Sequence, residues 1–214
     1  MSDFIRYLQI NSSYLLQQFT RHLLISVYGV LLAAILAIPL GFYMARRKKL
    51  AGLVISIANI IQTVPSLAML SIVMAVLGLG PNTVIATVFL YSLLPILKNT
   101  YTAVVHVDKD IIDVAKGLGM TKRQILMKVE LPLSLSVIMG GLRNAIVLGI
   151  GITTIGTFIG AGGLGDIITR GINVSDGSDI ILAGAIPTAL MAVAIDLLLS
   201  FVEKRLDKTH MTSN

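Results

Sequence analysis

Long runs of apolar residues dominate the chain, and five of them could cross the roughly 30 Å hydrocarbon core of a bilayer as helices. These predicted spans cover residues 23–44, 51–78, 82–106, 132–160 and 179–202. Shorter polar and charged stretches separate them. The pattern therefore predicts an all-α membrane protein with five transmembrane helices in a domain over residues 23–202.

Two of the predicted spans, 51–78 and 132–160, are longer than a bilayer needs at about 1.5 Å per helical residue. Such helices must tilt, kink or extend past the lipid. Pro65 interrupts the first and several glycines occur in the second, so we expect kinks in both. Three further prolines lie within spans, where each removes a backbone donor: Pro39, Pro95 and Pro187.

Composition excludes several classes of protein. Of the 214 residues, 55% are hydrophobic and 13% are charged, and the mean hydropathy is +0.87, which is far from a soluble domain. The absence of cysteine excludes disulfide scaffolds, thiolate zinc sites and cysteine nucleophiles. The three histidines are scattered without metal-ligand spacing, so no metal site is expected.

The basic residues indicate the orientation in the membrane. Of the 17 Lys and Arg, twelve follow spans one, three and five, whereas Arg6, Arg21 and Arg170 lie on the other side. The positive-inside rule then places the N-terminus outside and the C-terminus in the cytoplasm. Residues 1–22 become an external segment with a surface helix around Tyr14, and residues 203–214 a cytoplasmic tail. Topology thus explains the net charge of +6 without a nucleic-acid partner.

The hydrophilic loop between the third and fourth spans predicts two short helices over about 109–129. Asp108 or Asp110 can cap the first helix, Gly119 suits a left-handed turn, and Thr121 with Gln124 forms a capping box for the second. The first helix carries an apolar stripe of Ile111, Val114, Ala115 and Leu118. The stripe alone leaves open whether it rests on the membrane, on the chain's own bundle or on a partner.

The loop contains a motif with a recognisable spacing. The stretch Asp113-Val114-Ala115-Lys116-Gly117-Leu118-Gly119, followed after nine residues by Val129-Glu130-Leu131-Pro132, resembles the EAA motif of ABC importer permeases. Asp113 replaces the usual glutamate and Val114 the first alanine. The resemblance implies contact with a partner ATPase through seven residues: Asp113, Ala115, Lys116, Gly117, Gly119, Leu131 and Pro132.

Three other segments, residues 59–67, 91–101 and 158–166, resemble permeases for compatible solutes such as glycine betaine, carnitine and choline. This resemblance implies the type I ABC importer permease fold in a bacterial cytoplasmic membrane. It also implies an ATPase dimer, a second permease subunit, identical or not, and an external solute-binding protein. The chain has no G-x-x-x-x-G-K-[ST] sequence, so ATP and Mg belong to the partner ATPase and no cofactor is expected here.

Several residues are candidates for a solute pathway or gate. They belong to three features, a helix break, two tyrosines and a glycine-rich turn: Pro65, Tyr91, Tyr101, Gly160, Gly162 and Gly163. The segment 160–165 also satisfies G-x-G-x-x-G, but it follows a membrane helix, so a tight external turn is favoured over a dinucleotide site. The tyrosines could equally be packing residues.

Ionisable residues within spans need a partner or water. Lys98 lies near the cytoplasmic end of its span and is expected to extend toward the interface. Arg143 and Asp196 lie at similar depths, which favours a structural ion pair over a role in the pathway. Gly156 and Gly160 form a G-x-x-x-G pair, expected to serve packing within this chain before a subunit interface.

Two alternative functions stay open at this point. An ion-coupled secondary transporter would use intramembrane charges, but the chain has few of these and no visible inverted repeat. An ABC permease for another small solute, such as an amino acid, would share the motif in the loop. An intramembrane enzyme lacks a paired nucleophile and base.

Overall fold

The computed structural model describes residues 2–206, and all the secondary structure in that part of the chain is helical. His210 and the predicted tail beyond residue 206 lie outside the described residues. The α-helices are α1 (Ser2–Ile10), α2 (Ser12–Ala45), α3 (Lys48–Thr63), α4 (Ser66–Leu77), α5 (Pro81–Val105), α6 (Lys109–Gly117), α7 (Lys122–Ile125), α8 (Leu131–Ile155), α9 (Leu164–Ile172) and α10 (Ser178–Leu206). A π-helix, η1 (Leu126–Glu130), and a 3₁₀-helix, η2 (Gly156–Ile159), flank α8.

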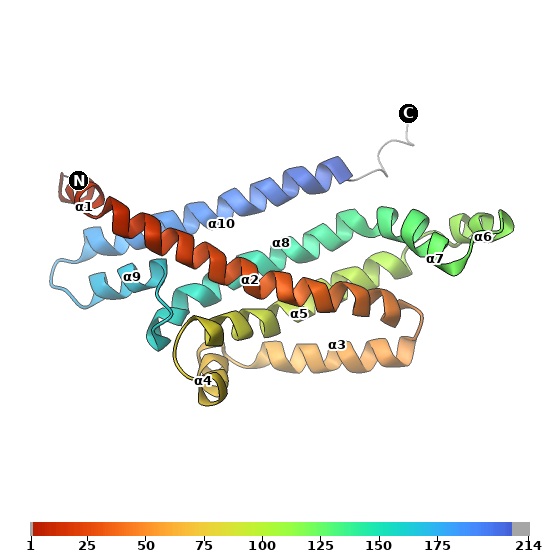
Figure 1. Cartoon of the computed structure of the whole chain (residues 1–214), viewed down its shortest axis with the longest axis horizontal. Coiled ribbons are helices and arrows are strands. Elements are labelled where there is room, and N and C mark those ends of the chain that lie inside the picture. Colours follow the sequence, from red (N-terminus) through yellow and green to blue (C-terminus); the bar gives the residue numbers. More distant parts are fainter. Residues whose placement is uncertain (1, 207–214) are drawn as a thin grey trace.

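Four long helices and one bent pair account for the five predicted spans. Helices α2, α5, α8 and α10 are each long and apolar enough to cross a membrane, whereas α3 and α4 meet this test together and are bent by 99°. Figure 1 shows α4 lying across the direction of α3, with α6 at one end of the bundle and α9 near the other. The predicted kink at Pro65 is confirmed, and the count of spans is five when the bent pair is taken as one span.

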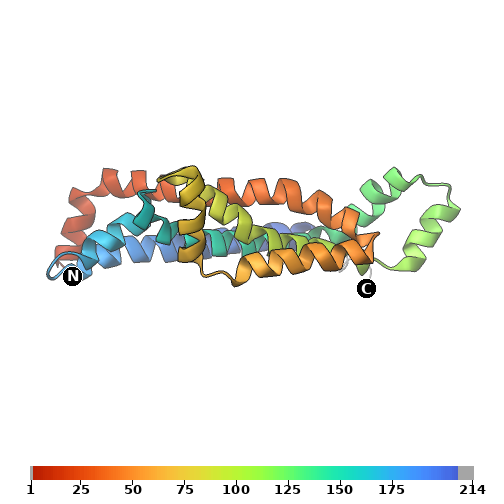
Figure 2. The same cartoon turned by 90° about the horizontal axis from the view of Figure 1, so that it is seen from below.

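The first span differs from its predicted boundaries. Helix α2 begins at Ser12, so Tyr14 and Phe19 belong to the spanning helix and pack against the core. The expected surface helix around Tyr14 is therefore wrong. Only α1 turns away from the axis of α2, as Figure 2 shows, and it contacts α10. The side chains of Tyr14, Gln18 and His22 meet α9 and its preceding loop, which an apolar pattern along one segment cannot reveal.

The fourth span is not broken at its glycines, in contrast to the second span at Pro65. Lys122–Ile159 forms one continuous helical segment, with α8 at its centre. Its glycines instead allow close helix packing: a Cβ on Gly156 would lie 2.6 Å from Val84, and one on Gly141 would lie 2.9 Å from the carbonyl oxygen of Pro95. Gly156 thus packs within the chain as predicted, whereas Gly160 lies beyond the helix with a φ of 72°.

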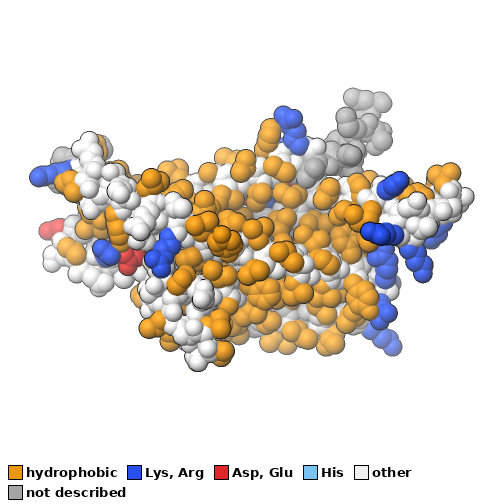
Figure 3. Space-filling model, viewed as in Figure 1, with side chains coloured by type: hydrophobic (Ala, Val, Ile, Leu, Met, Phe, Trp, Pro, Cys, Tyr) orange, Lys and Arg blue, Asp and Glu red, His pale blue; other side chains and the backbone are white. Residues whose placement is uncertain are grey.

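The core lies where α2, α5 and α8 pack together. Two glycines of α2 bring it close to α5, since a Cβ on Gly29 or Gly41 would lie 2.6 Å from Val88 or Thr100, respectively. Apolar side chains also cover much of the outer surface between the two ends, and Lys and Arg gather near α6 (Figure 3). An apolar belt between polar ends is the surface that a bilayer requires.

Candidate functional site

Helix α6 has a defined start and end because local hydrogen bonds satisfy its terminal backbone groups. The side chain of Asp108 accepts a hydrogen bond of 2.9 Å from the N–H of Asp110 at the N-terminus. At the C-terminus, Gly119 has a φ of 76°, and its N–H donates to Lys116 while that of Met120 donates to Ala115. These two bonds form a Schellman motif, which fixes the turn between α6 and α7.

Helix α7 starts with the predicted capping box. The Thr121 side chain accepts from the N–H of Gln124, and the Gln124 side chain accepts from the N–H of Thr121 at 2.7 Å. The chain then enters the π-helix η1, where the N–H of Leu131 donates to the carbonyl of Leu126. Pro132 has no N–H to bond with Lys128, and its ring disfavours a regular α-turn there, which accounts for the wider turn.

The two sides of α6 differ in how they are covered. Ala115 is only 4% exposed, whereas Ile111, Val114 and Leu118 are 44%, 64% and 77% exposed. Lys116 and Asp113 form an exposed ion pair of 2.8 Å, and Gly117 has open space beside it. The predicted stripe is therefore split, and its three exposed apolar residues have little cover from the described part of the chain.

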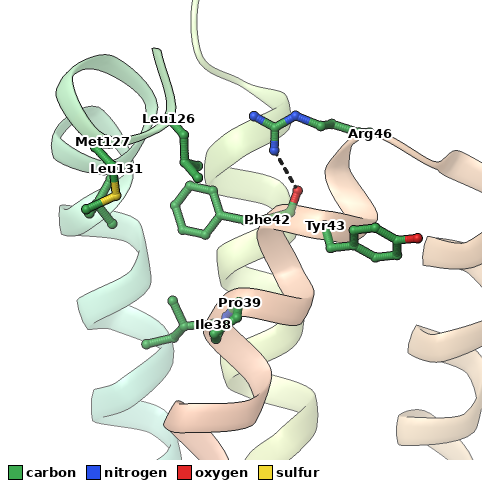
Figure 4. Close-up of a pocket in the computed structure, with 8 residues that line it drawn as sticks. All are labelled: Ile38, Pro39, Phe42, Tyr43, Arg46, Leu126, Met127 and Leu131. Carbon is green, nitrogen blue, oxygen red and sulfur yellow. Dashed lines mark hydrogen bonds between the residues drawn. The ribbon is translucent and has the colours of Figure 1, made fainter. Parts of the chain in front are cut away.

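An ion pair that the sequence analysis missed connects this loop to the first span. Arg46 Nη2 lies 2.6 Å from Glu130 Oε2, and Arg46 Nη1 donates to the carbonyl of Phe42. Figure 4 shows Phe42 directed from α2 toward Leu126 and Leu131 across an apolar groove of about 390 Å³. The end of α2 and the segment before α8 are thus joined by a charge contact and an apolar contact.

The break between α3 and α4 is held by side chains of neighbouring helices. Val64, the residue before Pro65, is extended, and its carbonyl accepts a hydrogen bond from the hydroxyl of Tyr91. The carbonyl of Tyr91, which loses its helical donor because of Pro95, accepts from Gln62 at 3.4 Å. Tyr91 therefore stabilises the break, while Tyr101 packs partly buried against the core.

The glycine-rich turn after η2 is fixed by side chains of α2. Gly160, Gly162 and Gly163 have φ values of 72°, 72° and 87°, a region that favours glycine. The N–H of Gly163 donates to Gln18 at 2.6 Å, and that of Leu164 donates to Nδ1 of His22 at 3.2 Å. The predicted tight turn is present, and it leads into α9.

His22 is fully buried and has a defined tautomer. Its Nδ1 accepts from the amide of Leu164, and its Nε2 lies 3.0 Å from the carbonyl oxygen of Ile150, which can only accept. The ring is therefore neutral with its proton on Nε2. Near it, Tyr14 donates to Asp166 at 2.6 Å, and Asp166 also pairs with Arg170. Sequence reasoning missed the contacts of His22 and Tyr14 because their partners are far apart in the chain.

Arg143 and Asp196 meet, and a third residue joins them. Arg143 donates to both carboxylate oxygens of Asp196, at 2.9 and 3.0 Å, and to Glu203 at 2.7 Å. Glu203 was not identified from the sequence, although it follows Asp196 by two helical turns and so shares its face of α10. The two acidic residues connect α8 and α10 through one guanidinium group.

With this geometry established, the chain was compared with known proteins. Residues 37–208 match the family described as the binding-protein-dependent transport system inner membrane component. The chain belongs to this permease family. As a family member it is a multi-pass membrane protein and a subunit of a transport system, not an enzyme.

Curated relatives of this permease cover almost its whole length. The carnitine transport permease protein OpuCD of Listeria monocytogenes is 59% identical over 97% of this chain and 93% of its own. The glycine betaine/carnitine/choline transport system permease protein OpuCD of Bacillus subtilis is also 59% identical, over 94% of this chain and 87% of its own. The choline transport system permease protein OpuBD of Bacillus subtilis is 53% identical over 96% of this chain and 91% of its own.

Solved structures show the same fold as this permease at low sequence identity. An inward-facing form of the MetNI methionine ABC transporter matches 92% of this chain and 96% of its own, with a TM-score of 0.74 and 19% identity. An amino acid ABC transporter with histidines matches 94% of this chain and 98% of its own, with a TM-score of 0.74 and 17% identity. The predicted type I ABC importer permease fold is confirmed.

The ion triad of this permease yields a prediction about stability. Replacing Arg143 by Met leaves two carboxylates close together without a cation, which is more harmful than removing Asp196, since Glu203 still pairs with Arg143. We expect Arg143→Met to lower the melting temperature of the detergent-solubilised protein by several degrees, and Asp196→Leu to lower it less. The combined variant should recover part of the loss.

The exposed residue Lys204, which lies beside Glu203 on α10, provides the control. Lys204→Met removes a positive charge outside the triad and should leave the melting temperature unchanged. If the combined variant melted no higher than Arg143→Met alone, the charges of Arg143 and Asp196 would not compensate each other.

Proposed function

We propose that this chain is the transmembrane permease subunit of an ATP-driven importer for osmoprotectants such as carnitine, glycine betaine and choline. The observation that carries the proposal is the capped pair of α6 and α7, which holds Val114 and Leu118 exposed at one end of a transporter fold. The choice of solute class is supported by the printed names of relatives that are 53–59% identical.

Helices α6 and α7 are proposed to bind a partner ATPase dimer, which supplies ATP hydrolysis with Mg. The exposed Val114 and Leu118 give apolar contact, and the rigid turn at Gly119 keeps the two helices at one angle. Closure of the ATPases would then move α6 together with α8, since η1 joins α7 to α8 without a loop. The Arg46–Glu130 ion pair extends this connection to α2.

The solute pathway is proposed to lie between this chain and a second permease subunit, with solute delivered by an external binding protein. The bend between α3 and α4 together with α4, and the turn at 160–163, lie toward the end of the bundle away from α6, in keeping with a role at the outer gate (Figure 1). The hydrogen bond from Gly80 to Ile159, 2.9 Å long, connects these two features.

The orientation proposed for the chain has the N-terminus outside and the C-terminus in the cytoplasm. It follows from the excess of Lys and Arg at the α6 end of the bundle, where a cytoplasmic ATPase would bind (Figure 3). A reporter fused after Asn214 should behave as cytoplasmic, and a tag before Ser2 should be accessible from outside the cell. Finding both termini on one side would contradict this topology.

Uptake measurements test the solute class and the energy source. Cells that make this chain with its ATPase and binding protein should accumulate radiolabelled carnitine, glycine betaine or choline, and uptake should require ATP. An uncoupler that leaves ATP high should not abolish uptake, whereas it would stop an ion-coupled secondary transporter. When the binding protein is replaced by one that recognises another solute, the transporter should take up the solute of the new binding protein. Uptake of amino acids alone would refute the osmoprotectant assignment.

Gly119→Leu tests the proposed coupling. A branched side chain at a φ of 76° costs roughly 1 kcal/mol or more in the turn, although a Cβ there meets no neighbouring atom. We expect the variant to reach the membrane at normal levels, while uptake falls at least several-fold and less ATPase co-purifies. Gly119→Asn should retain most activity, because Asn adopts the left-handed conformation more readily. Wild-type uptake in Gly119→Leu would show that the turn is unimportant.

A further inference from the structure

A polar pocket opens on the face of the bundle formed by α3, α5 and α8. Its volume is about 460 Å³, within the range of roughly 300–1,000 Å³ typical of small-molecule sites. The apolar part of its wall comes from Leu94 and Pro95. Five polar side chains from the three helices complete the lining: Gln62, Lys98, Asn99, Thr102 and Asn144.

Close packing of α5 and α8 brings the polar side chains of the pocket together. Gly141 lets α8 approach α5 so closely that an added Cβ would meet the carbonyl oxygen of Pro95 at 2.9 Å. Asn144, nearly one turn further along α8, then lies beside Lys98 and Asn99. The amide groups of Gln62 and Asn99 donate hydrogen bonds to the carbonyls of Tyr91 and Pro95, respectively. The amide of Asn144 and the ammonium of Lys98 form no such bond within the described residues.

This lining is unsuited to contact with lipid. Amide and ammonium groups at membrane depth are costly unless they meet water, protein or a ligand. Lys98 lies about two turns before the end of α5 at Val105, and no salt bridge pairs it with an acidic side chain of residues 4–205. By contrast, the exposed side chains along α10 include Leu190, Leu197 and Phe201, which suit lipid. The pocket therefore faces a polar space.

The chemistry of the pocket selects an anion. Lys98 and Asn144 offer hydrogen-bond donors and a positive charge, which match a carboxylate. A quaternary ammonium group prefers aromatic faces, and no aromatic side chain lines this pocket. We infer that the pocket binds the carboxylate of zwitterionic solutes such as glycine betaine and carnitine as they pass through the permease, with Lys98 as the charged contact. This inference rests on the proposed function.

Uptake of solutes with and without a carboxylate tests the inference. The assembled transporter, with its ATPase and a binding protein for each solute, is reconstituted in proteoliposomes with radiolabelled glycine betaine, carnitine or choline. Choline carries the same quaternary ammonium group but no carboxylate. Lys98→Met should slow uptake of glycine betaine and carnitine about tenfold or more, the loss expected for a charge-assisted hydrogen bond, and should leave choline uptake within about twofold.

Three further variants make the test specific. Lys98→Arg keeps the charge and should retain most uptake of the carboxylate solutes. Asn144→Ala should reduce uptake of the same two solutes by a smaller factor. Lys49→Met removes a basic, exposed residue outside the pocket and should change nothing. Co-purification of the second permease subunit is measured for every variant and should stay constant.

The outcomes separate this inference from the proposed function. Equal loss of all three solutes in Lys98→Met, or loss of the second subunit, would assign Lys98 to folding or to a partner's acidic group and overturn the inference. Unchanged uptake would also overturn it, by showing that the pocket lies off the pathway. Failure of the wild-type transporter to take up any of the three solutes would overturn the proposed function and the inference together.

Discussion

Backbone groups that leave regular helical hydrogen bonding need a new partner, because lipid offers none. This constraint explains four of the polar contacts between helices in the described part of the chain. At Pro65 the carbonyl of Val64 accepts from Tyr91, and at Pro95 the carbonyl of Tyr91 accepts from Gln62. In the turn after η2, the side chains of Gln18 and His22 accept hydrogen bonds from the backbone N–H groups of Gly163 and Leu164, respectively. The breaks at Pro65 and Pro95 and the turn after η2 are thus each specified by a side chain on another helix.

The same constraint shapes the loop that we propose to couple transport to ATP hydrolysis. Its turn is satisfied by local backbone bonds at Gly119 and its second helix by the Thr121 capping box, so it needs no support from the bundle. Its connection to α8 is a π-turn imposed by Pro132, which keeps the segment helical. A rigid loop joined to a spanning helix without a flexible link is suited to transmit movement.

Charged groups follow a related logic inside the bundle. Arg143 is matched by Asp196 and Glu203, so the triad joins α8 to α10 and each of its three groups has an oppositely charged neighbour. Lys98 instead shares a pocket with the amides of Gln62, Asn99 and Asn144, and no carboxylate from the described residues lines that pocket. The guanidinium of Arg143, which pairs with two carboxylates, fits a structural role. The ammonium of Lys98, which lies in a pocket with amides, has the binding role that we infer. It also makes α5, which carries Lys98, Tyr91 and Pro95, the central helix of the proposed pathway.

The sequence alone determined the number of spans, the break at Pro65 and the geometry of the α6–α7 turn, because these depend on hydropathy and on hydrogen bonds between near neighbours. It also predicted that Arg143 and Asp196 would meet, from their depth in the membrane. Only the tertiary structure showed that Glu130, Glu203, Gln18 and His22 have partners, that α2 begins before residue 23, and that Lys98 shares a pocket with Asn144. These contacts join residues far apart in the chain, so their existence depends on which helix faces pack together, and hydropathy does not distinguish one packed face from another.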